Sequence, residues 1–399
     1  MISVQEADSI IFNDILTFAK SKVSLDQSFG LILQEDIVAD RDFPPFHRVA
    51  MDGIAINLSA WNKGVRVFPI EGTQKAGSPR LKLRDEKACL EVMTGAVLSI
   101  GCDCVIPVEN IEVKENAAYL RDGFKVVHML NVHQQGADGK QRDVVLKKGI
   151  RLCSPQVAIA ASVGKSMICV TQQPKIAIIG TGDELVAIDQ KPEVYQIRQS
   201  NAYALKSALQ THNFTDFTHF HIRDDRVILE EQLKEILKDF DVIILSGGVS
   251  MGKFDFVPRV LDSLGVKVLF HKVRQRPGKP FWFGKSKESK PVFALPGNPV
   301  ATQIGVYRYV LPYLNKASGL ISAKKEYACL SEDVDVKTPF TYFLPVKIIS
   351  TEDGCRTVVP VYTGGSGDFA ALGRTDGFIE LPSDTFHFLK GLAVPFYQW

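Results

Sequence analysis

The sequence predicts a multidomain α/β protein: a doubly wound α/β domain, an inserted all-β domain, a mixed N-terminal linker domain and a C-terminal β domain. Buried strand patterns alternate with helical patterns from Lys175 to Asn315, which is the rhythm of a doubly wound sheet. Short β patterns broken by Gly and Asn fill residues 54–145, and β patterns return after Asn315. A chain of 399 residues is too long for one ordinary core. The predicted domains are residues 1–50 with 140–172, residues 51–139, residues 173–318 and residues 319–399.

The composition is that of a soluble globular protein, with 45% hydrophobic and 23% charged residues. A net charge of only +2 gives no general field for binding nucleic acid or a membrane. The first twenty or so residues lack the basic-then-apolar order of a signal peptide. Seven scattered cysteines suit reduced thiols, and Cys102 and Cys104 have no partners at zinc spacing. We therefore expect a cytoplasmic protein that binds neither nucleic acid nor membrane.

The N-terminal segment predicts a helix followed by a rigid loop. Apolar residues recur at helical spacing over residues 3–20. Pro44 and Pro45 forbid helix further on, and Gly53 marks a turn. Asp52, directly before Gly53, is either a plain turn aspartate or a carboxylate presented to a ligand.

Residues 54–145 predict the inserted all-β domain. Its expected strands are residues 65–70, 88–94, 104–108 and 118–127. Thr94 places a hydroxyl on a turn, and Asp138 lies in a Gly-flanked polar loop where solvation is the default. A short strand and a helix over residues 155–163 then return the chain to its first segment.

The α/β domain is the clearest unit in the sequence. The expected strands are residues 175–179, 215–222, 241–245 and 292–295. The expected helices are residues 200–211, 226–240, a segment ending near 264, and 301–314. His219 and His221 share one face of their strand, and packed imidazoles are favoured there over metal ligands. After this domain, strands are expected at residues 327–334, 340–349, 357–362, 377–381 and 392–397, with a flexible turn at residues 364–367.

One turn at a strand end dominates the α/β domain. The apolar strand 241–245 leads directly into Ser246, Gly247, Gly248 and Ser250. Ligands of open α/β sheets bind beyond the carboxyl ends of the strands. Two glycines allow close backbone approach and an N–H-lined anion seat, to which the serine hydroxyls add donors. A plain strand–helix turn is the alternative.

Acids follow several predicted strands, and cations lie nearby in the sequence. The acids are Asp183 and Glu184, Asp224 and Asp225, and Asp255. Helix capping is the alternative role for each. A cluster of like charges at one sheet edge is costly unless cations balance it, and the sequence supplies Lys272, Arg274, Arg276 and Lys279. Together these features predict Mg²⁺ and a phosphate-bearing substrate. The rigid loop Pro296, Gly297, Asn298 and Pro299 opens the last helix, where an anion binds readily.

Six motifs in order make the chain resemble the molybdopterin molybdenumtransferase family, which includes the gephyrin E domain. The matching stretches are residues 44–46 with 50–53, residues 93–96, 181–185, 246–255, 277–280 and 295–299. The resemblance implies an elongated homodimer in which the inserted domain is a lid and the α/β domain is molybdopterin-binding. It also implies the last step of molybdenum cofactor synthesis: adenylylated molybdopterin and molybdate are used, and AMP leaves.

The resemblance also assigns roles to residues. It implies catalytic roles for Asp52, Asp224, Asp255, Lys272, Arg276 and Lys279. Glu184 and Asp255 correspond to magnesium ligands. Substrate contacts are implied for Thr94, Asp138, Thr181, Gly182, Asp183, Ser246, Gly247, Gly248, Ser250, Pro296, Gly297, Asn298 and Pro299. Asp52 is expected to reach the α/β cleft of the other subunit, and the adenylyltransferase that supplies the substrate is an expected partner.

The chain departs from the family pattern at several loop positions. These are His47, Arg48 and Val49, Ile54, Gln134 and Gln135, and Arg276, which stands in place of a lysine. Arg48 is expected to be a solvated loop residue. The alternative functions are a molybdopterin adenylyltransferase, against which Ser246–Ser250 and the inserted domain argue, and a non-catalytic pterin-binding scaffold.

Overall fold

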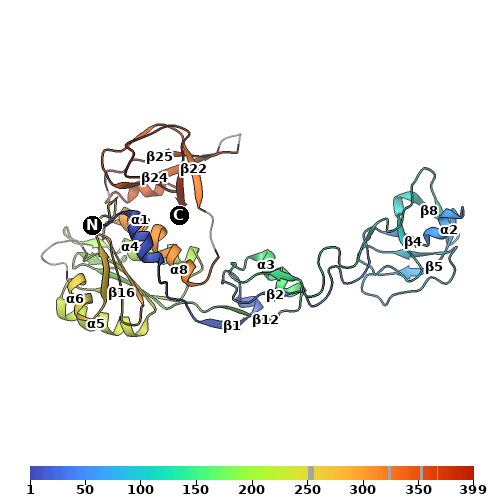
Figure 1. The fold of residues 1–399 in the computed structure, drawn as a ribbon, viewed down its shortest axis with the longest axis horizontal. Coiled ribbons are helices and arrows are strands. Elements are labelled where there is room, and N and C mark those ends of the chain that lie inside the picture. Colours follow the sequence, from blue (N-terminus) through green and yellow to red (C-terminus); the bar gives the residue numbers. More distant parts are fainter. Residues whose placement is uncertain (250–255, 322–324, 351–353, 366) are drawn as a thin grey trace. The chain divides into compact units, whose positions relative to one another are not determined.

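The computed structural model describes residues 1–249, 256–321, 325–350, 354–365 and 367–399 (Figure 1). The chain forms two compact units. The first comprises Met1–Glu35, Gly149–Cys153 and Met167–Trp399, and the second comprises Asp36–Lys148 and Ser154–Ser166. Each unit has hydrophobic cores of its own. The four domain boundaries expected from the sequence stay a prediction.

A six-stranded sheet organises the α/β part of the first unit. Its strands are β13 (Ile176–Thr181), β16 (Phe217–Ile222), β17 (Val242–Ser246), β18 (Lys267–His271), β20 (Trp282–Lys285) and β21 (Pro291–Leu295), in the order β16-β13-β17-β21-β20-β18. The first four strands in this order are parallel, β20 runs antiparallel to β21, and the edge strand β18 runs antiparallel to β20. The sequence analysis did not predict β18 and β20. The segment between them was interpreted by its basic residues, and the strand propensity on either side was not considered. A short pair, β14 (Leu185–Val186) with β15 (Ile197–Arg198), follows β13.

Helices cover both faces of this sheet, which confirms the doubly wound fold (Figure 1). Helices α5 (Arg226–Asp239) and α6 (Val257–Ser263) pack on one face through Leu233 and Val260. Helix α4 (Ser200–Thr211) packs on the other face through Leu205 and Leu209. Asp225 caps α5 by accepting hydrogen bonds from the N–H groups of the helix's first turn, which is the capping alternative for that acid.

The helix predicted over residues 301–314 is interrupted. The structure has α7 (Pro299–Gly305), a π-helical turn (Val306–Val310) and α8 (Leu311–Ala317). Pro312 has no N–H and cannot donate to the carbonyl four residues earlier. Such a missing bond is commonly accommodated by a π turn.

The C-terminal part of the first unit is built of strands, as the sequence predicts, and these strands form a closed sheet. Its strands are β19 (Gln275–Arg276), β22 (Glu326–Leu330), β24 (Thr341–Ser350), β25 (Arg356–Pro360), β26 (Gly377–Leu381) and β28 (Ala393–Gln398), with β23 (Val334–Asp335) paired to β27 (His387–Phe388). Strand β24 pairs with both β25 and β26, which closes the sheet, and β19 joins β24 from the α/β part. A 3₁₀ turn (Ala370–Arg374) precedes β26.

The N-terminal helix is shorter than the stripe over residues 3–20 predicted. Helix α1 (Val4–Phe12) starts at a Ser3 capping box and ends at Asn13. Asp14 then adopts a positive φ of 57°, which a helix cannot continue. The chain goes on to β1 (Lys20–Ser24), which pairs with β12 (Met167–Thr171), and to a 3₁₀ turn (Leu25–Gln27).

The second unit is built mainly of strands, as the sequence predicts. A six-stranded sheet has the order β7-β4-β6-β5-β9-β8. Its members are β4 (Gly53–Ile56), β5 (Val67–Gln74), β6 (Cys89–Val92), β7 (Cys104–Pro107), β8 (Ile111–Lys114) and β9 (Ala117–Leu120). Two short pairs join β2 (Ile37–Val38) to β11 (Val144–Leu146) and β3 (Arg48–Val49) to β10 (Val132–His133). The helices are α2 (Leu58–Asn62), α3 (Ser154–Ser162) and a 3₁₀ turn (Val108–Asn110).

Candidate functional site

The parallel strands of the first unit end side by side, and the loops after them carry most of the predicted site residues. Thr181 pairs with Ile222, Gly180 with Ser246, and Ser246 with Leu295. These ends therefore share one edge of the sheet. That edge includes the point between β13 and β17 where the strand order changes direction, which is where open α/β sheets bind ligands.

The turn after β17 needs both of its glycines. Gly247 and Gly248 have φ values of 101° and 64°, which favour glycine. A Cβ on Gly247 would lie 2.7 Å from the backbone oxygen of Thr181, and one on Gly248 would lie 2.7 Å from Cγ2 of Val257. The N–H of Gly247 donates to the carbonyl of Leu295 at 3.2 Å. The prediction that the Gly247 N–H is available to an anion is therefore wrong. That N–H continues the hydrogen bonding between β17 and β21 into the turn.

A cavity of about 580 Å³ lies at this edge, and we call it the strand-end cavity. Predicted residues that line it are Thr181, Glu184, Asp224, Ser246, Gly247, Gly248, Pro296, Gly297, Asn298 and Pro299. Gly182 and Asp183 are not among the lining residues. Gly182 instead leaves room for Glu184, whose carboxylate oxygens lie 2.5 and 2.7 Å from a Cβ built at that glycine. The strand-end motifs thus converge on one hollow.

Asn201, at the start of α4, ties the loops of this cavity together, and the sequence interpretation missed it. Its Nδ2 donates to Oγ of Ser246 at 2.8 Å and to the carbonyl of Gly297 at 2.7 Å. Ser246 is only 5% exposed, and its hydroxyl also meets the Thr302 hydroxyl at 3.4 Å. The Ser246 hydroxyl therefore holds two loops together, where the sequence predicted a donor to a ligand.

Three neutral polar side chains of the strand-end cavity carry buried atoms that lack a partner. Within the described ranges, the buried atoms without a hydrogen bond are Thr181 Oγ1, Asn201 Oδ1, His219 Nε2 and Gln303 Oε1. The first three of these residues line this cavity. Leaving such atoms unpaired is costly, so the cavity is suited to a ligand with uncharged polar edges. Burial lowers the pKa of His219 to about 4, with smaller contributions from Lys206 and His221, so its imidazole is neutral at pH 7.

Two of the predicted basic residues line a second cavity, of about 510 Å³, which we call the basic cavity. Arg276 and Lys279 line it together with Phe340 and residues 363–365 of the C-terminal part. Lys279 Nζ lies 5.7 Å from the centre of the Phe340 ring. Pro280, Pro296 and Asn298 line both cavities, so the two adjoin.

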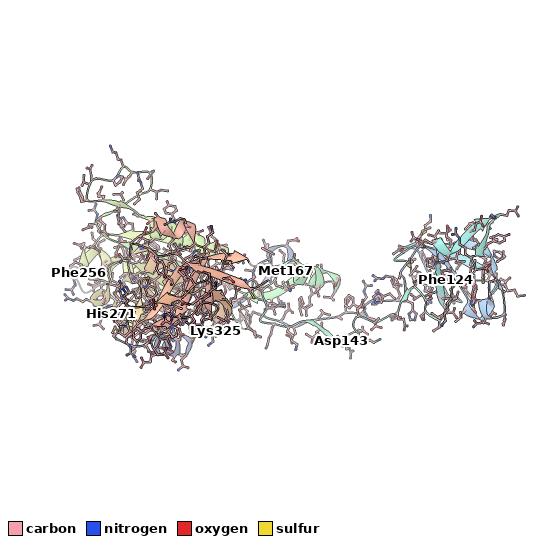
Figure 2. The ribbon with its side chains drawn as sticks, turned by 90° about the horizontal axis from the view of Figure 1, so that it is seen from above. Phe124, Asp143, Met167, Phe256, His271 and Lys325 are labelled. Atoms are coloured by element: carbon pink, nitrogen blue, oxygen red, sulfur yellow. The ribbon has the colours of Figure 1, made fainter. Side chains whose placement is uncertain are left out.

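Lys272, another of the four predicted cations, lines neither of these two cavities. It follows His271, which is labelled in Figure 2 and whose imidazole meets the Val249 carbonyl at 3.1 Å. The backbone of Lys272 has a φ of 76° and bonds both to Ile2 and to Phe281. Its described contacts are thus those of a turn residue.

In the second unit, Asp52 and Thr94 form the pair that the motifs predicted to be near a ligand. Oδ1 of Asp52 accepts hydrogen bonds from the Thr94 N–H at 2.6 Å and from the Thr94 hydroxyl at 2.7 Å. These bonds hold the pKa of the exposed Asp52 carboxyl below its ordinary value, the hydroxyl contributing most. Asp52 is therefore an oriented, ionised carboxylate, and its presentation to a ligand stays a prediction.

Asp138 belongs to a chain of three side chains in the second unit. Arg48 lies 3.1 Å from Nδ1 of His133, and Nε2 of His133 lies 2.9 Å from Oδ1 of Asp138. A guanidinium can only donate, so Nδ1 accepts and Nε2–H donates to Asp138. The expectation that Arg48 is merely solvated is therefore wrong. Asp138, expected to be solvated by default, is likewise anchored.

Two further departures from the family pattern are also engaged within the loops of the second unit. Nδ1 of His47 accepts from the N–H of Gln135 at 3.1 Å, and Nε2 of Gln135 donates to Asp42 at 3.0 Å. These side chains shape the loop around the prolines. The described hydrogen bonds of His47 and Gln135 are made within the protein and need no substrate to complete them.

Two of the predicted site residues fall outside the described residues. Ser250 and Asp255 lie in the gap between residues 249 and 256. The roles assigned to them stay predictions.

Comparison with known proteins decides the family. Three family models match successive parts of the chain: the MoeA N-terminal region (domain I and II) at residues 2–164, a probable molybdopterin binding domain at residues 177–316, and the MoeA C-terminal region (domain IV) at residues 327–399. A molybdopterin molybdenumtransferase from Synechocystis sp. is 40% identical over 400 residues, covering 100% of both chains.

The chain belongs to the molybdopterin molybdenumtransferase family. A relative of that name from Staphylococcus epidermidis is 33% identical and covers 98% of this chain and 94% of its own. The crystal structure of a molybdopterin biosynthesis MoeA protein from Pyrococcus horikoshii OT3 matches with a TM-score of 0.84 at 26% identity, covering 100% of both chains. Membership makes this molybdenumtransferase an enzyme of molybdenum cofactor biosynthesis and confirms the predicted multidomain fold.

The carboxylates of the strand-end cavity suit magnesium chemically. Glu184 and Asp224 both line the cavity, and the Asp224 N–H donates to Asp183 at 3.3 Å. No three metal-binding side chains come together anywhere in the described part of the molybdenumtransferase. Mg²⁺ is commonly held by one or two carboxylates with water and substrate phosphates, so two carboxylates that line the same cavity fit it.

Two weaker sequence signals have ordinary structural explanations. Cys102 and Cys104 are buried, and burial raises the pKa of the Cys102 thiol to about 12, which suits a core residue. His221 Nε2 meets the Gly182 carbonyl at 3.0 Å.

Among the helices that the structure describes, none is long and apolar enough to cross a membrane. Asn201, in α4, carried no motif, and His219 was expected to be a packed imidazole; their place beside the ends of the parallel strands is what brings both to the strand-end cavity.

Proposed function

We propose that this molybdenumtransferase inserts molybdenum from molybdate into adenylylated molybdopterin and releases AMP. Family membership supports molybdenum transfer, and the adjoining strand-end and basic cavities support a reaction that needs two different ligands. The single observation that carries the proposal is this separation: uncharged polar atoms and carboxylates line one cavity, and the cations Arg276 and Lys279 line the other. The reaction is placed in the cytoplasm, which the odd number of scattered cysteines favours.

The strand-end cavity is proposed to hold the pterin nucleotide. Its glycine turn allows the closest approach to the sheet edge, and Thr181, Asn201 and His219 supply uncharged polar atoms there. Ile178 and Leu205 add apolar walls. A flat heterocycle with donors and acceptors on its rim satisfies both kinds of surface.

The basic cavity is proposed to hold molybdate. Arg276 and Lys279 are exposed within it, and a compact oxyanion takes charge-assisted hydrogen bonds from both. Because the cavity adjoins the first through Asn298, an oxyanion held there lies next to the substrate that receives the metal.

Glu184, with Asp255, is proposed to hold Mg²⁺, and Asp224 to keep the charge of this region negative. When bound, the ion would offset the charge on the bridge between the two phosphoryl groups. The protein's own part is to fix the nucleotide beside these carboxylates and to keep the departing AMP in place until the metal has been transferred.

The active form is proposed to be a homodimer, with Asp52 and Thr94 of one subunit serving the α/β cleft of the other. Asp138 is proposed to shape the same lid loops. The adenylyltransferase that makes the substrate is proposed to be a partner protein. Mixing inactive Asp52→Ala and Asp255→Ala chains should restore about a quarter of the sites, since random pairing gives half heterodimers with one intact site each. No recovery after verified subunit exchange would place each site within one chain.

The function is tested by incubating the purified chain with adenylylated molybdopterin, Mg²⁺ and molybdate and measuring AMP. Release that requires both ions supports the proposal. Tight binding of the pterin without AMP release indicates a scaffold. Adenylylation of free molybdopterin from ATP indicates the adenylyltransferase activity instead.

A further inference from the structure

The loop that carries Arg276 and Lys279 is held from inside the protein by one glutamine. Gln275 is only 2% exposed although it lies between two arginines in the sequence. Its Nε2 donates to the carbonyls of Pro277 at 3.4 Å and Gly278 at 3.3 Å. The amide thus reaches the backbone of the next turn, which ends at Lys279.

The other end of the Gln275 side chain is fixed by a tyrosine from the π-helical turn. The hydroxyl of Tyr309 donates to Oε1 of Gln275 at 2.5 Å. Tyr309 is fully buried, and burial raises its pKa, so the hydroxyl stays a donor. The single amide therefore links the π-helical turn to the basic loop.

Tyr309 is itself held in place on several sides. Its ring lies 4.8 Å from the ring of Phe281, and the guanidinium of Arg308 lies 5.0 Å from its centre. Arg308 donates two bonds to Asp8, of 2.8 and 2.7 Å, and two to Glu380, of 2.8 and 3.5 Å. A residue anchored in this way has little freedom to follow the loop, so it can set the position of the loop.

The loop has little tolerance around the glutamine. Gly278 has a φ of 92°, and a Cβ there would lie 2.7 Å from Nε2 of Gln275. On the other side, Gln275 and Arg276 pair with Thr341 and Tyr342 of β24. The cations of the basic cavity are thus carried by a turn that is braced by the closed sheet and by the Gln275 amide.

We infer that Gln275, oriented by Tyr309, is a positioning residue that sets the geometry of Arg276 and Lys279 for oxyanion binding. The inference rests on the proposed function of the basic cavity. Tyr309 does not line the basic cavity; Gln275 does, but it is only 2% exposed and its amide is engaged by the turn and by Tyr309. Without the amide, the carbonyls of Pro277 and Gly278 lose their buried donor, and the turn is free to move the two cations apart.

The test compares Gln275→Met, Tyr309→Phe and a matched control, Tyr313→Phe, in the full-length chain. Tyr313 is also fully buried, and its hydroxyl accepts a bond from the Leu16 N–H at 3.2 Å, but it has no described contact with the loop. AMP release is titrated with molybdate, and pterin nucleotide binding and thermal stability are measured beside it. A stability role alone lowers the melting temperature in all three variants without moving the molybdate titration.

We expect Gln275→Met to raise the half-saturating molybdate concentration about tenfold, and Tyr309→Phe severalfold. Pterin nucleotide binding stays unchanged, and Tyr313→Phe shifts neither titration. Because both residues act through one path, adding Tyr309→Phe to Gln275→Met has no further effect on the molybdate titration.

The inference is overturned if Gln275→Met folds and its half-saturating molybdate concentration matches that of the wild type. If Gln275→Met does not fold, Tyr309→Phe decides, and an unchanged titration overturns the inference. Lys279→Ala separates this failure from failure of the proposed function. If only Lys279→Ala raises the half-saturating molybdate concentration, the basic cavity still binds molybdate and only the role of Gln275 is rejected. If Lys279→Ala leaves that concentration unchanged, the proposed function of the basic cavity is rejected.

Discussion

The strand-end cavity and the basic cavity are similar in size, at about 580 and 510 Å³, yet they are built in different ways. The first is made of turns that continue directly from neighbouring parallel strands. The second joins a loop of the α/β part to the closed C-terminal sheet through the pairing of Gln275 with Thr341. Adjacent parallel strands bring the first together automatically, whereas the second depends on contacts between residues far apart in the sequence.

The two cavities also differ in charge. The strand-end cavity contains neutral atoms without partners at Thr181, Asn201 and His219, with carboxylates at Glu184 and Asp224. The basic cavity contains Arg276 and Lys279. A cation placed among the carboxylates would bind them and lose its affinity for an oxyanion. Separating the two sets keeps each available for its own ligand.

The largest expected effect follows from removing a carboxylate of the strand-end cavity. Glu184→Gln should lower the rate of AMP release by about 10²–10³-fold, as loss of one charge-stabilising group typically does. Rates are measured at saturating molybdate while Mg²⁺ is varied. Glu193→Gln is the control, because Glu193 is exposed and lines neither cavity. A wild-type rate in Glu184→Gln at limiting Mg²⁺ would contradict this role.

A smaller effect is expected from the residue that joins the loops of the strand-end cavity. Asn201→Ala removes the bonds to Ser246 and Gly297. The loss should reduce the free energy of unfolding by about 1–3 kcal/mol, because it leaves buried polar groups unpaired. Urea unfolding measures this cost. Gln210→Ala on the exposed side of the same helix is the control, and equal stability of the two variants would show that the described bonds contribute nothing.

The smallest expected effect concerns pH and His219. Its folded pKa is about 4, below the ordinary value of 6.5. Below pH 6.5 the unfolded chain therefore binds a proton that the folded chain does not, and the contribution of His219 to stability is lost as the pH falls from about 6.5 to about 4. Denaturant midpoints at pH 7.5 and 5 should differ more for the wild type than for His219→Asn. The same pH dependence in both proteins would be evidence against a buried neutral imidazole.

The sequence predicted the strand-end cavity better than it predicted the rest, for a physical reason. Glycines and acids directly after buried strands must meet at one sheet edge, so Gly247, Glu184 and Asn298 could be placed together. Asn201 could not, because an asparagine at a helix start is an ordinary cap residue until the neighbouring loops are known. The Gln275–Tyr309 bond joins positions 34 residues apart, and no periodicity reports such a contact. Ser246 is a different case: its motif position predicted a ligand donor, its hydroxyl also bonds inside the protein, and its role toward a ligand stays a prediction.

The same contrast holds in the second unit. The pairing of Asp52 with Thr94 joins two motifs that the sequence had singled out separately. The chain from Arg48 through His133 to Asp138 was not foreseen, because His133 had no motif and Arg48 was taken as solvated. Local sequence patterns identify the residues at the ends of strands and in turns. They do not identify the distant side chains whose hydrogen bonds hold those residues in place.

The central claim is that molybdate and the pterin nucleotide bind in different cavities. It is tested most directly by titrating AMP release separately with each of the two ligands, in Lys279→Ala and in Asn201→Ala. Lys287→Ala, an exposed lysine that lines neither cavity, is the charge control. Lys279→Ala should raise the half-saturating molybdate concentration about tenfold and leave that of the pterin nucleotide within about twofold. Asn201→Ala should do the reverse. A shift of both titrations in each variant, or a molybdate titration unmoved by Lys279→Ala, would contradict the assignment of the two ligands to two cavities.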